Sequence, residues 1–209
     1  MLKDASPNTR GACRPAESHA RKHTNVTNTA NADGRERVHR IWTELQRATV
    51  DRHHEWRTPV LATTGLDGLP QARTVVLRGA DAKAQQLVFF TDSRSPKVAE
   101  LQTLPAAAFV FWSKRLSWQL RVGVSTQVHI AGPLVDTAWS RVSQSAAAGD
   151  YLTPHPPGSP LHQPTEAKQD AHHLAVVTAH IDHLDWLELS REGHRRARLT
   201  QDTAEWLVP

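Results

Sequence analysis

The chain lacks the short motifs that usually accompany nucleotide binding and nucleophilic catalysis. Its 209 residues contain no G-x-x-x-x-G-K-[ST], no G-x-G-x-x-G, no G-x-S-x-G and no C-x-x-C. Each of these motifs marks a defined geometry, such as a glycine-rich turn around a phosphate, a nucleophile elbow or a redox dithiol. Their absence argues against a P-loop or dinucleotide fold and against serine or thiol catalysis.

Cysteine and long apolar runs are equally scarce. Cys13 is the only cysteine, so an intrachain disulfide is impossible. No stretch approaches the roughly 20 apolar residues of a membrane span. The first residues also lack the apolar segment that is typical of a secretory signal. We therefore expect a cytoplasmic protein with no membrane partner.

Excess charge of one sign is confined to one end of the chain. Residues 1–40 hold eight Lys/Arg and four Asp/Glu, whereas residues 41–209 hold seventeen of each. A body without net charge argues against a nucleic-acid partner. Residues 1–33 are rich in Asn, Thr, Ala and Arg without apolar periodicity, so we expect a disordered tail there and one domain over residues 34–209.

Thirteen histidines raise the question of a metal site. The close pairs in the sequence are His53-His54, His172-His173 and His180-x-x-His183. None has the i, i+4 spacing of a helical ligand pair, and residues three apart on a strand point to opposite faces. We therefore expect solvated histidines and no bound metal.

Hydrophobic periodicity divides the body into a helix and a series of strands. Residues 35–52 have helical spacing of apolar side chains, which predicts an amphipathic helix. Strict alternation over residues 117–131 predicts a strand, and Gly123 in its middle suggests a bulge. Asp67-Gly68 is a hairpin turn signal. Further strands are predicted at residues 58–64, 71–79, 85–91, 106–112, 173–180, 184–189, 195–200 and 204–208.

Two shorter helices and a loop interrupt these strands. Ser95-Pro96 predicts a helix start with Ser95 as its side-chain cap, and Asp136 predicts the cap of a helix that runs to residue 148. Residues 153–164 contain five prolines and predict a loop or lid. Six or more antiparallel strands with short helices indicate a β-barrel with helical decorations.

The helix start at Ser95 carries two cations where helix electrostatics favours acids. Arg94 and Lys97 both lie near the positive end of the helix dipole. A bound phosphate would make this arrangement favourable, because N–H groups, dipole and cations would act on one dianion. The alternative is that both cations are solvated. Arg73 shares a strand face with two apolar residues and needs a partner, and Gln119 places an amide on a regular strand.

Five groups of residues, taken in order, resemble the flavin-binding core of pyridoxamine 5'-phosphate oxidase and its relatives. They are RTVVLRG, FFTDSRSPK, SWQLRV, SQS, and LDWLEL followed by GHRRARL. The resemblance covers residues 57–209. It implies a mainly β fold, namely a six-stranded antiparallel split β-barrel of Greek-key type with flanking helices. It further implies a homodimer that holds FMN in clefts at the subunit interface.

The resemblance also implies roles for individual residues. Arg73 and Lys97 would bind the FMN phosphate, and Gln119 would read the polar edge of the flavin. Phe90 and Thr91 would lie beside the ring, while Gln144 and Ser145 would reach it at the interface. Trp186 and Arg196 would close over the ring system. The strand beneath the cofactor would consist of Arg73, Thr74, Val75, Val76, Leu77 and Arg78.

The part of the pattern that recognises substrate is altered. Pro96 stands where the oxidases carry an arginine, and the segment before SQS has no room for their Tyr, Arg and Ser phosphate contacts. Their Arg-x-His appears here as Glu192-x-His194. Arg78 stands where those oxidases have a basic substrate contact, so the resemblance makes Arg78 and His194 the candidate catalytic residues near a small-molecule substrate.

These observations predict an FMN-dependent oxidoreductase with a diverged substrate site. In the oxidases, the flavin takes a hydride from a carbon bearing an amine or hydroxyl, and dioxygen reoxidises it. The alternatives are a split barrel that binds flavin or haem without turnover, an FMN reductase with a nicotinamide donor, and a barrel for single-stranded nucleic acid.

Overall fold

The computed structural model describes residues 20–160, 171–201 and 203–209, with side chains in the first helix from residue 32 onward. Three α-helices, two 3₁₀-helices and nine strands occur in these ranges. The helices are α1 (Ala20–Val50), η1 (Glu55–Arg57), α2 (Pro96–Thr103), α3 (Pro133–Val142) and η2 (Ala146–Tyr151). The strands are β1 (Val60–Thr64), β2 (Pro70–Thr74), β3 (Leu77–Asp81), β4 (Gln86–Asp92), β5 (Ala106–Ser113), β6 (Trp118–His129), β7 (Leu174–Glu188), β8 (Arg195–Leu199) and β9 (Ala204–Leu207).

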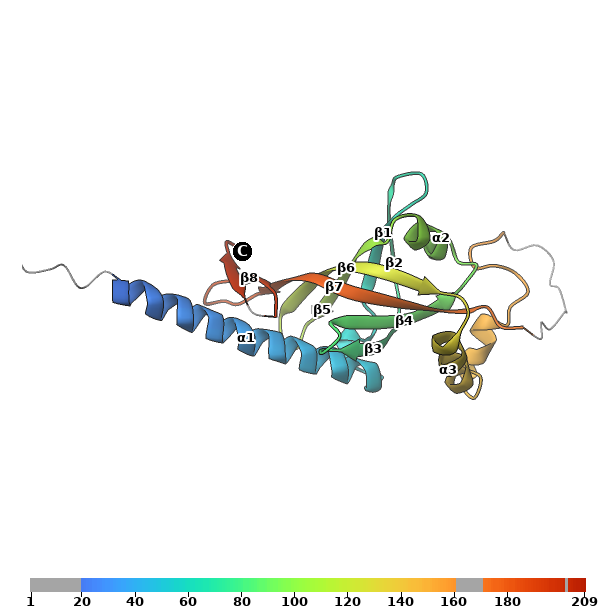
Figure 1. Cartoon of the computed structure of the whole chain (residues 1–209), viewed down its shortest axis with the longest axis horizontal. Helices are drawn as coiled ribbons and strands as arrows, with labels where there is room; N and C mark the ends of the chain where they lie inside the picture. The colour runs from blue at the N-terminus through green and yellow to red at the C-terminus, as the bar shows by residue number, and fades with distance from the viewer. Residues whose placement is uncertain (1–19, 161–170, 202) are drawn as a thin grey trace, which may run out of the picture.

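The nine strands form one antiparallel sheet that does not close. The strand order is β2-β1-β5-β6-β7-β4-β3, and the β8–β9 hairpin extends from β7. The mainly β, antiparallel split-barrel fold is confirmed. The sheet has nine strands rather than six, because the hairpin adds two and because residues 71–79 break into β2 and β3. Figure 1 shows the long β6 and β7 at the centre of this arrangement.

Residues 71–79 were expected to form one strand, and this expectation is wrong. β2 pairs with β1, whereas β3 pairs with β4 on the other edge of the sheet. The chain crosses between the two edges at residues 75–76, where the Val75 amide donates to the carbonyl of Pro59 at 3.0 Å. Val75 and Leu77 are both buried, so the core fixes this crossing.

The bulge expected near Gly123 is present. Gly123 lies opposite His183 and Val124 lies opposite Ile181, so Asp182 is the extra residue on β7. A Cβ at Gly123 would lie 2.1 Å from the His183 ring, which therefore occupies the space over the glycine. β7 continues through the bulge as one 15-residue strand, where two separate strands were expected.

Helix α1 begins at Ala20, well before the expected start at residue 35. It packs along the sheet through buried Val38, Ile41, Trp42 and Leu45, and it reaches from β3 to β9 (Figure 1). The expected disordered tail overlaps this helix from residue 20, and residues 1–19 lie outside the described residues. No helix in the described ranges has the length and hydropathy to cross a bilayer.

The third helix and the proline-rich segment differ from expectation in their limits. α3 ends at Val142 instead of residue 148, and Gly132, with φ of 93°, occupies the N-cap position in place of Asp136. Asp136 lies inside the first turn, where its charge still suits the dipole. Residues 153–160 have no regular secondary structure, as expected of a loop, and the rest of the segment lies outside the described residues.

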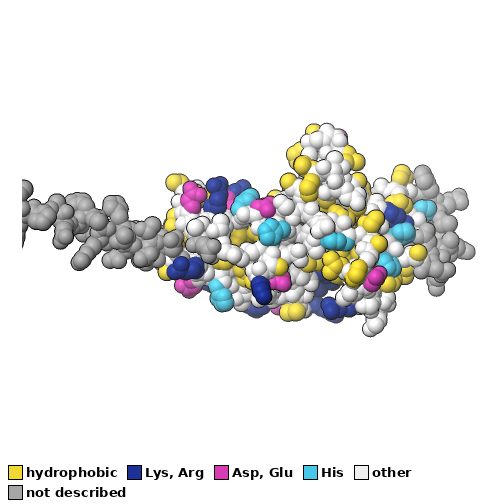
Figure 2. Space-filling view, viewed as in Figure 1, with side chains coloured by type: hydrophobic (Ala, Val, Ile, Leu, Met, Phe, Trp, Pro, Cys, Tyr) yellow, Lys and Arg dark blue, Asp and Glu magenta, His cyan; other side chains and the backbone are white. Residues whose placement is uncertain are grey.

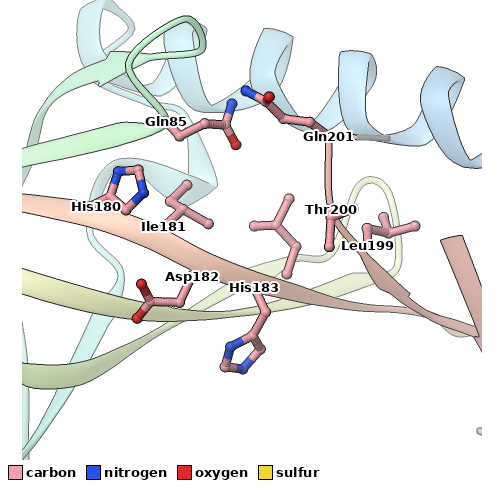
Figure 3. Close-up of a pocket in the computed structure, with 9 residues that line it drawn as sticks. Gln85, His180, Ile181, Asp182, His183, Leu199, Thr200 and Gln201 are labelled. Atoms are coloured by element: carbon pink, nitrogen blue, oxygen red, sulfur yellow. The ribbon is translucent and has the colours of Figure 1, made fainter. Parts of the chain in front are cut away.

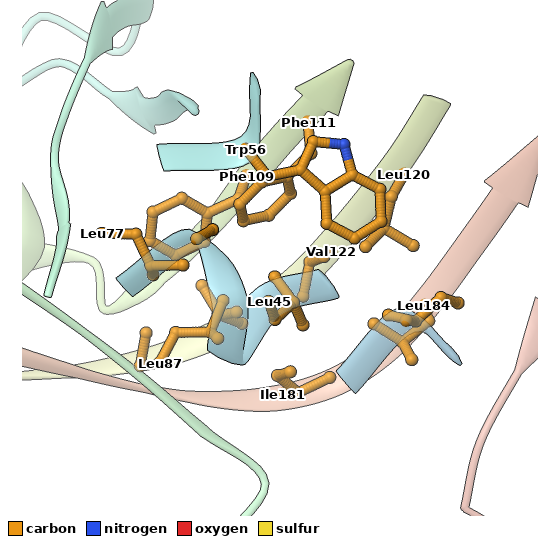
Figure 4. Packing of buried hydrophobic residues seen from close by; sticks show 14 of the residues in the cluster. Leu45, Trp56, Leu77, Leu87, Phe109, Phe111, Leu120, Val122, Ile181 and Leu184 are labelled. Carbon is orange, nitrogen blue, oxygen red and sulfur yellow. The ribbon is translucent and has the colours of Figure 1, made fainter. Parts of the chain in front are cut away.

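The main core lies between α1 and one face of the sheet (Figure 4). Its largest members are aromatic, and the Phe111 ring contacts Trp56 at a ring distance of 5.6 Å and Phe109 at 6.0 Å. A second, smaller cluster joins α3 and η2 to the sheet through residues such as Val135, Tyr151 and Leu174. Figure 2 shows acids and bases intermixed over the visible face, in line with the uncharged body.

Candidate functional site

Lys97 lies in the first turn of α2 among buried hydroxyl groups. Its Nζ donates to Thr91 Oγ1 at 3.0 Å and to Ser95 Oγ at 2.5 Å. Thr91 is the last residue but one of β4 and Ser95 directly precedes the helix, so both hydroxyls are fixed by backbone structure. Ser95 occupies the N-cap position, but its side chain makes no cap hydrogen bond. The expected side-chain cap is therefore wrong, because Ser95 instead accepts a hydrogen bond from Lys97.

Arg73 reaches the same region from β2. Its Nη2 donates to Glu100 Oε2 at 2.9 Å, and its Nη1 contacts Thr63 Oγ1 on β1. Thr63 Oγ1 donates to the same carboxylate oxygen at 2.6 Å. Glu100 is 6% exposed and Thr63 is 7% exposed. A guanidinium that shared a strand face with apolar residues was expected to need a partner, and Glu100 is that partner.

The two cations are close enough to act on each other. Burial lowers the pKa of Lys97 below its usual value, the positive charge of Arg73 lowers it further, and Glu100 and Asp92 partly oppose this. Among the described residues, no carboxylate lies within ion-pair distance of the Lys97 ammonium. We define this group as the cationic cluster; its members are Thr63, Arg73, Thr91, Ser95, Lys97 and Glu100.

Arg94 does not join the cationic cluster. Its Nη2 pairs with Asp92 Oδ2 at 2.7 Å and donates to the carbonyl of Thr153 at 2.9 Å. Asp92 is buried, which by itself raises its pKa, but the hydrogen bonds and charge of Arg94 outweigh this and lower it. Arg94 therefore holds residues 153–155 against the end of β4, and the expectation that it faces an anion beside Lys97 is wrong.

Arg78 occupies a β-bulge on β3. Leu77 pairs with Phe89 and Gly79 pairs with Val88, which leaves Arg78 as the extra residue. A bulge redirects a side chain out of the regular alternation. The guanidinium lies 5.8 Å from the Phe90 ring, and its Nε is buried with no hydrogen-bond partner among the residues that the structure describes. Burial raises the pKa of the neighbouring Tyr151, while the charge of Arg78 and a hydrogen bond with it lower it.

Gln119 and Arg196 share one face of the sheet. Gln119 lies opposite Leu187, and Leu187 lies opposite Arg196, so the two polar side chains project to the same side. With strands about 4.8 Å apart, they are separated by about 10 Å. Arg196 donates to Asp185 at 3.0 and 2.8 Å. Trp112, which is 47% exposed, continues this row on β5.

Trp186 projects to the opposite face from Arg196. It is fully buried, contacts Trp118 at a ring distance of 5.3 Å, and has the Arg37 guanidinium 4.7 Å above its ring. The sequence spacing of ten places Ala197, and not Arg196, directly across from Trp186. Within one chain the two residues therefore do not meet over a single ring system.

The remaining sequence candidates lie farther away. Gln144 and Ser145 are exposed in the turn after α3, and Ser145 is used locally, because its hydroxyl donates to the Val142 carbonyl at 2.8 Å. His194 lies in the turn between β7 and β8, where its Nδ1 accepts a hydrogen bond from the Ser190 amide at 3.2 Å. The neutral ring then carries its proton on Nε2.

A single chain does not bring the two candidate catalytic residues together. Arg78 lies beside Phe89, which pairs with Val177, whereas His194 follows the end of β7 at Glu188. These two positions are eleven residues apart on β7. At a rise of about 3.3 Å per residue, they are about 36 Å apart.

The hollows on the described surface include the following three. One of about 390 Å³ lies beside the cationic cluster, between Gly65, Leu66, Asp67 and Gln71 of the β1–β2 hairpin and Pro96, Ala99 and Glu100 of α2. One of about 520 Å³ contains Glu188, Glu192 and His194. The third, of about 330 Å³, lies along the middle of β7, where Figure 3 shows Asp182 and His183 turned away from Gln85 and Gln201.

Metal ligands do not gather in the described ranges. No group of three or more His, Cys, Asp or Glu side chains there has the arrangement to hold a metal ion. His183 lies against Gly123, and Asp182 accepts from Ser125 at 3.0 Å.

Sequence reasoning missed Thr63, Glu100 and Tyr151. Glu100 follows Lys97 by three residues, so helical spacing places both on one face of α2 and could have indicated the link. Thr63 shares the buried face of β1 with Leu61, but nothing in the sequence pairs it with Arg73. Tyr151 lies at the end of a 3₁₀-helix that shows no periodic signal.

Comparison with known proteins shows which family model this part of the chain matches. Residues 38–130 match the family model described as pyridoxamine 5'-phosphate oxidase, FMN-binding domain. These residues are therefore similar to the FMN-binding domain of the pyridoxamine 5'-phosphate oxidase-like split-barrel family. The matched residues include the whole cationic cluster, Arg78 and Gln119, and they end before Gln144, Trp186 and Arg196.

The relatives match over limited lengths. A pyridoxine/pyridoxamine 5'-phosphate oxidase of Saccharopolyspora erythraea is 36% identical over 108 residues, which cover 52% of this chain and 41% of the relative. One of Thermosynechococcus vestitus is 50% identical over 62 residues, which cover 30% of this chain and 28% of the relative. The chain thus spans less than half of the length of these relatives.

Two solved structures share the fold. A pyridoxamine 5'-phosphate oxidase-related, FMN-binding protein of Nostoc punctiforme superposes with a TM-score of 0.60 at 23% identity, over 80% of this chain and 94% of that chain. PhzG of Burkholderia lata, in complex with tetrahydrophenazine-1-carboxylic acid, gives 0.61 at 17% identity, over 74% and 83% of the two chains. These two likenesses extend the shared split-barrel architecture beyond residue 130.

Proposed function

We propose that the chain is an FMN-dependent oxidoreductase whose cofactor is anchored by the cationic cluster. The observation that carries the proposal is the convergence of Arg73 and Lys97 at the start of α2, beside the hydroxyls of Thr91 and Ser95. Burial and, after it, the positive charge of Arg73 lower the pKa of Lys97, so its ammonium is held in a place where its charge is unfavourable without an anion. A phosphate dianion is the ligand class that relieves such an arrangement, through charge-assisted hydrogen bonds.

FMN, when bound, would supply a two-electron acceptor for hydride transfer from an amine or alcohol, with reoxidation by oxygen. The residues of the chain would bind and orient it. Arg73 and Lys97 would hold the phosphate, and the crossing at residues 75–76 would pass beneath the ring. Arg78, redirected by its bulge and buried at Nε, would face the substrate side and favour an anionic or electron-rich group.

A second copy of the chain would complete the site. Gln119 and Arg196 lie on the outer face of the sheet beside the exposed Trp112, and His194 lies far from Arg78 within one chain. A homodimer in which one chain supplies the cationic cluster and the other supplies Arg196 and His194 would bring these groups to one cofactor. Sedimentation of the flavin-loaded protein as a monomer would contradict this arrangement.

The test is a titration of the purified protein with FMN and with riboflavin, followed by flavin absorbance. We expect FMN to bind at least tenfold more tightly than riboflavin, because only FMN carries the phosphate. Bleaching of the bound flavin by pyridoxamine phosphate without oxygen would identify the substrate class. Equal affinity for the two flavins, or no uptake of either, would refute the proposed anchor.

Flavin binding without turnover is the second candidate. The separation of Arg78 and His194 in one chain and the altered Glu192-x-His194 favour it. The anaerobic experiment separates the two candidates, because a protein that only binds flavin leaves it oxidised with pyridoxamine phosphate and with nicotinamide donors. A Soret band after addition of haem would instead indicate a haem-binding split barrel.

A further inference from the structure

Glu100 is a buried carboxylate inside the proposed phosphate site. It is 6% exposed, and its Oε2 accepts hydrogen bonds from two neighbours, Thr63 at 2.6 Å and Arg73 at 2.9 Å. A negative charge at this place opposes a phosphate, so its presence needs a physical reason. The reason lies in the geometry of Arg73.

The Glu100–Thr63 pair engages one edge of the guanidinium. Arg73 Nη2 donates to the carboxylate, and Nη1 contacts Thr63 Oγ1. A guanidinium has five N–H donors in a fixed plane, so three donors remain, including Nε–H. With the terminal edge held, the side edge formed by Nε and one terminal nitrogen is presented as a fork, which is the geometry that binds phosphate in a bidentate manner.

Glu100 also lies on the same face of α2 as Lys97, the other cation of the cluster. It follows Lys97 by three residues on α2, and its charge raises the pKa of Lys97 against the lowering by burial and by Arg73. The side chain is itself fixed, because α2 packs through buried Val98 and Leu101 on either side of it in the sequence. An isolated Arg73 on the edge strand β2 has no comparable anchor.

We infer that Glu100, together with Thr63, is a positioning residue that fixes the Arg73 guanidinium so that one free edge faces the cofactor phosphate. This inference rests on the proposed FMN site. It assigns the carboxylate a geometric role, in which the acceptor oxygen matters more than its charge. Glutamine, which keeps an acceptor oxygen at the same distance along the side chain, can therefore replace it.

The experiment compares Glu100→Ala and Glu100→Gln with the unaltered protein in titrations with FMN and riboflavin. We expect Glu100→Ala to raise the FMN Kd at least tenfold and to leave the riboflavin Kd within twofold. Glu100→Gln keeps an acceptor for both Thr63 and Arg73 and is expected to stay within threefold of the unaltered protein for FMN. Thr63→Val, which keeps the shape of the side chain, is expected to raise the FMN Kd by a smaller factor than Glu100→Ala.

Each other result contradicts the inference. Equal weakening of FMN and riboflavin by Glu100→Ala indicates a structural role, and tighter FMN binding by both Glu100 variants indicates that the carboxylate merely repels the phosphate. A Glu100→Gln variant as weak as Glu100→Ala overturns positioning through the acceptor oxygen. If Glu100→Ala does not fold, the FMN affinities of Glu100→Gln and Thr63→Val still test the positioning role. Failure of the unaltered protein to bind FMN refutes the proposed function itself, so the two failures are distinguishable.

Discussion

Replacing Lys97 by methionine removes the one cluster cation that has no carboxylate within ion-pair distance among the described residues. The side chain keeps its apolar length, so packing at the start of α2 is preserved. A hydrogen bond to a charged group contributes about 1.5–3 kcal/mol. At about 1.4 kcal/mol per factor of ten, the FMN Kd should rise roughly 10- to 150-fold. The Lys97 ammonium is half-buried between Thr91 and Ser95, which places the effect in the upper part of this range.

The measurement is a pair of fluorescence titrations, with FMN and with riboflavin, on Lys97→Met and on Lys83→Met. Lys83 is exposed in the β3–β4 turn and serves as a control for loss of one positive charge. Riboflavin shares the ring but lacks the phosphate, so its affinity should change less than twofold in both variants. An unchanged FMN Kd in Lys97→Met, or equal losses for FMN and riboflavin, would refute the assignment of Lys97 to the phosphate.

The pH dependence gives an independent check on the same residue. Burial and the charge of Arg73 lower the pKa of Lys97 from its usual value of 10.5. Lys97 therefore loses its proton below pH 10.5 in the flavin-free protein, and a bound dianion would favour the charged form. FMN affinity should decline as the pH rises toward 10.5, relative to riboflavin affinity, and this relative decline should be absent in Lys97→Met.

Two further predictions concern stability. A hydrogen bond from Arg196 lowers the pKa of Asp185, and Arg121 lowers it further, whereas burial raises it. The ion pair therefore stabilises the fold at any pH above the unfolded pKa of about 3.9. This contribution is lost as the pH falls through the lower pKa of the folded protein. Arg196→Gln should therefore lower the thermal midpoint at pH 7, and the difference from the unaltered protein should shrink below pH 4; a difference that stays constant with pH would contradict this. Gly34→Ala should destabilise the protein by about 1–3 kcal/mol in urea denaturation, because the added methyl would lie 2.3 Å from the Ala204 Cβ. Gly149→Ala, with no atom within 4 Å of the new Cβ, is the control and should stay within about 0.5 kcal/mol.

Period-two alternation predicted the strands well where one face is buried and the other is solvated. β6 shows this clearly, because Trp118, Leu120, Val122 and Val124 are all buried. The prediction of a single strand over residues 71–79 was wrong for the same physical reason that the prediction of β6 was right. Their alternation continues through a crossing between two edges of the sheet, and burial of Val75 and Leu77 imposes the same pattern on a crossing as on a strand.

The helix limits depended on tertiary contacts that local patterns do not record. α1 extends to Ala20 although residues 20–33 contain several poor helix formers. Part of the reason lies far away in the sequence, since Gly34 contacts Ala204 on β9 and Arg195 pairs with Asp33 at 2.6 Å. The sequence of the N-terminal segment alone does not indicate these distant partners.

The sequence singled out several residues of the cationic cluster but not the partners that they have in the structure. Arg73 and Lys97 were identified from a strand pattern and a helix start, and they lie together. Trp186 was given a cofactor role by resemblance, yet it lies in the core. The spacing of ten residues to Arg196 crosses a turn, and register across β7 and β8 then decides which faces the two side chains occupy.

The pairing of charges at the start of α2 explains why so many cations can gather there. Arg94 is held by Asp92, and Arg73 is held by Glu100, so each of these arginines meets a buried carboxylate. Among the described residues Lys97 has hydroxyl partners only, and the five charges therefore sum to one positive unit. A phosphate dianion would convert this sum to one negative unit, next to helix N–H groups that favour negative charge. Without a ligand, the helix start retains one positive charge that its own dipole opposes, and this imbalance makes an anion the physically expected occupant.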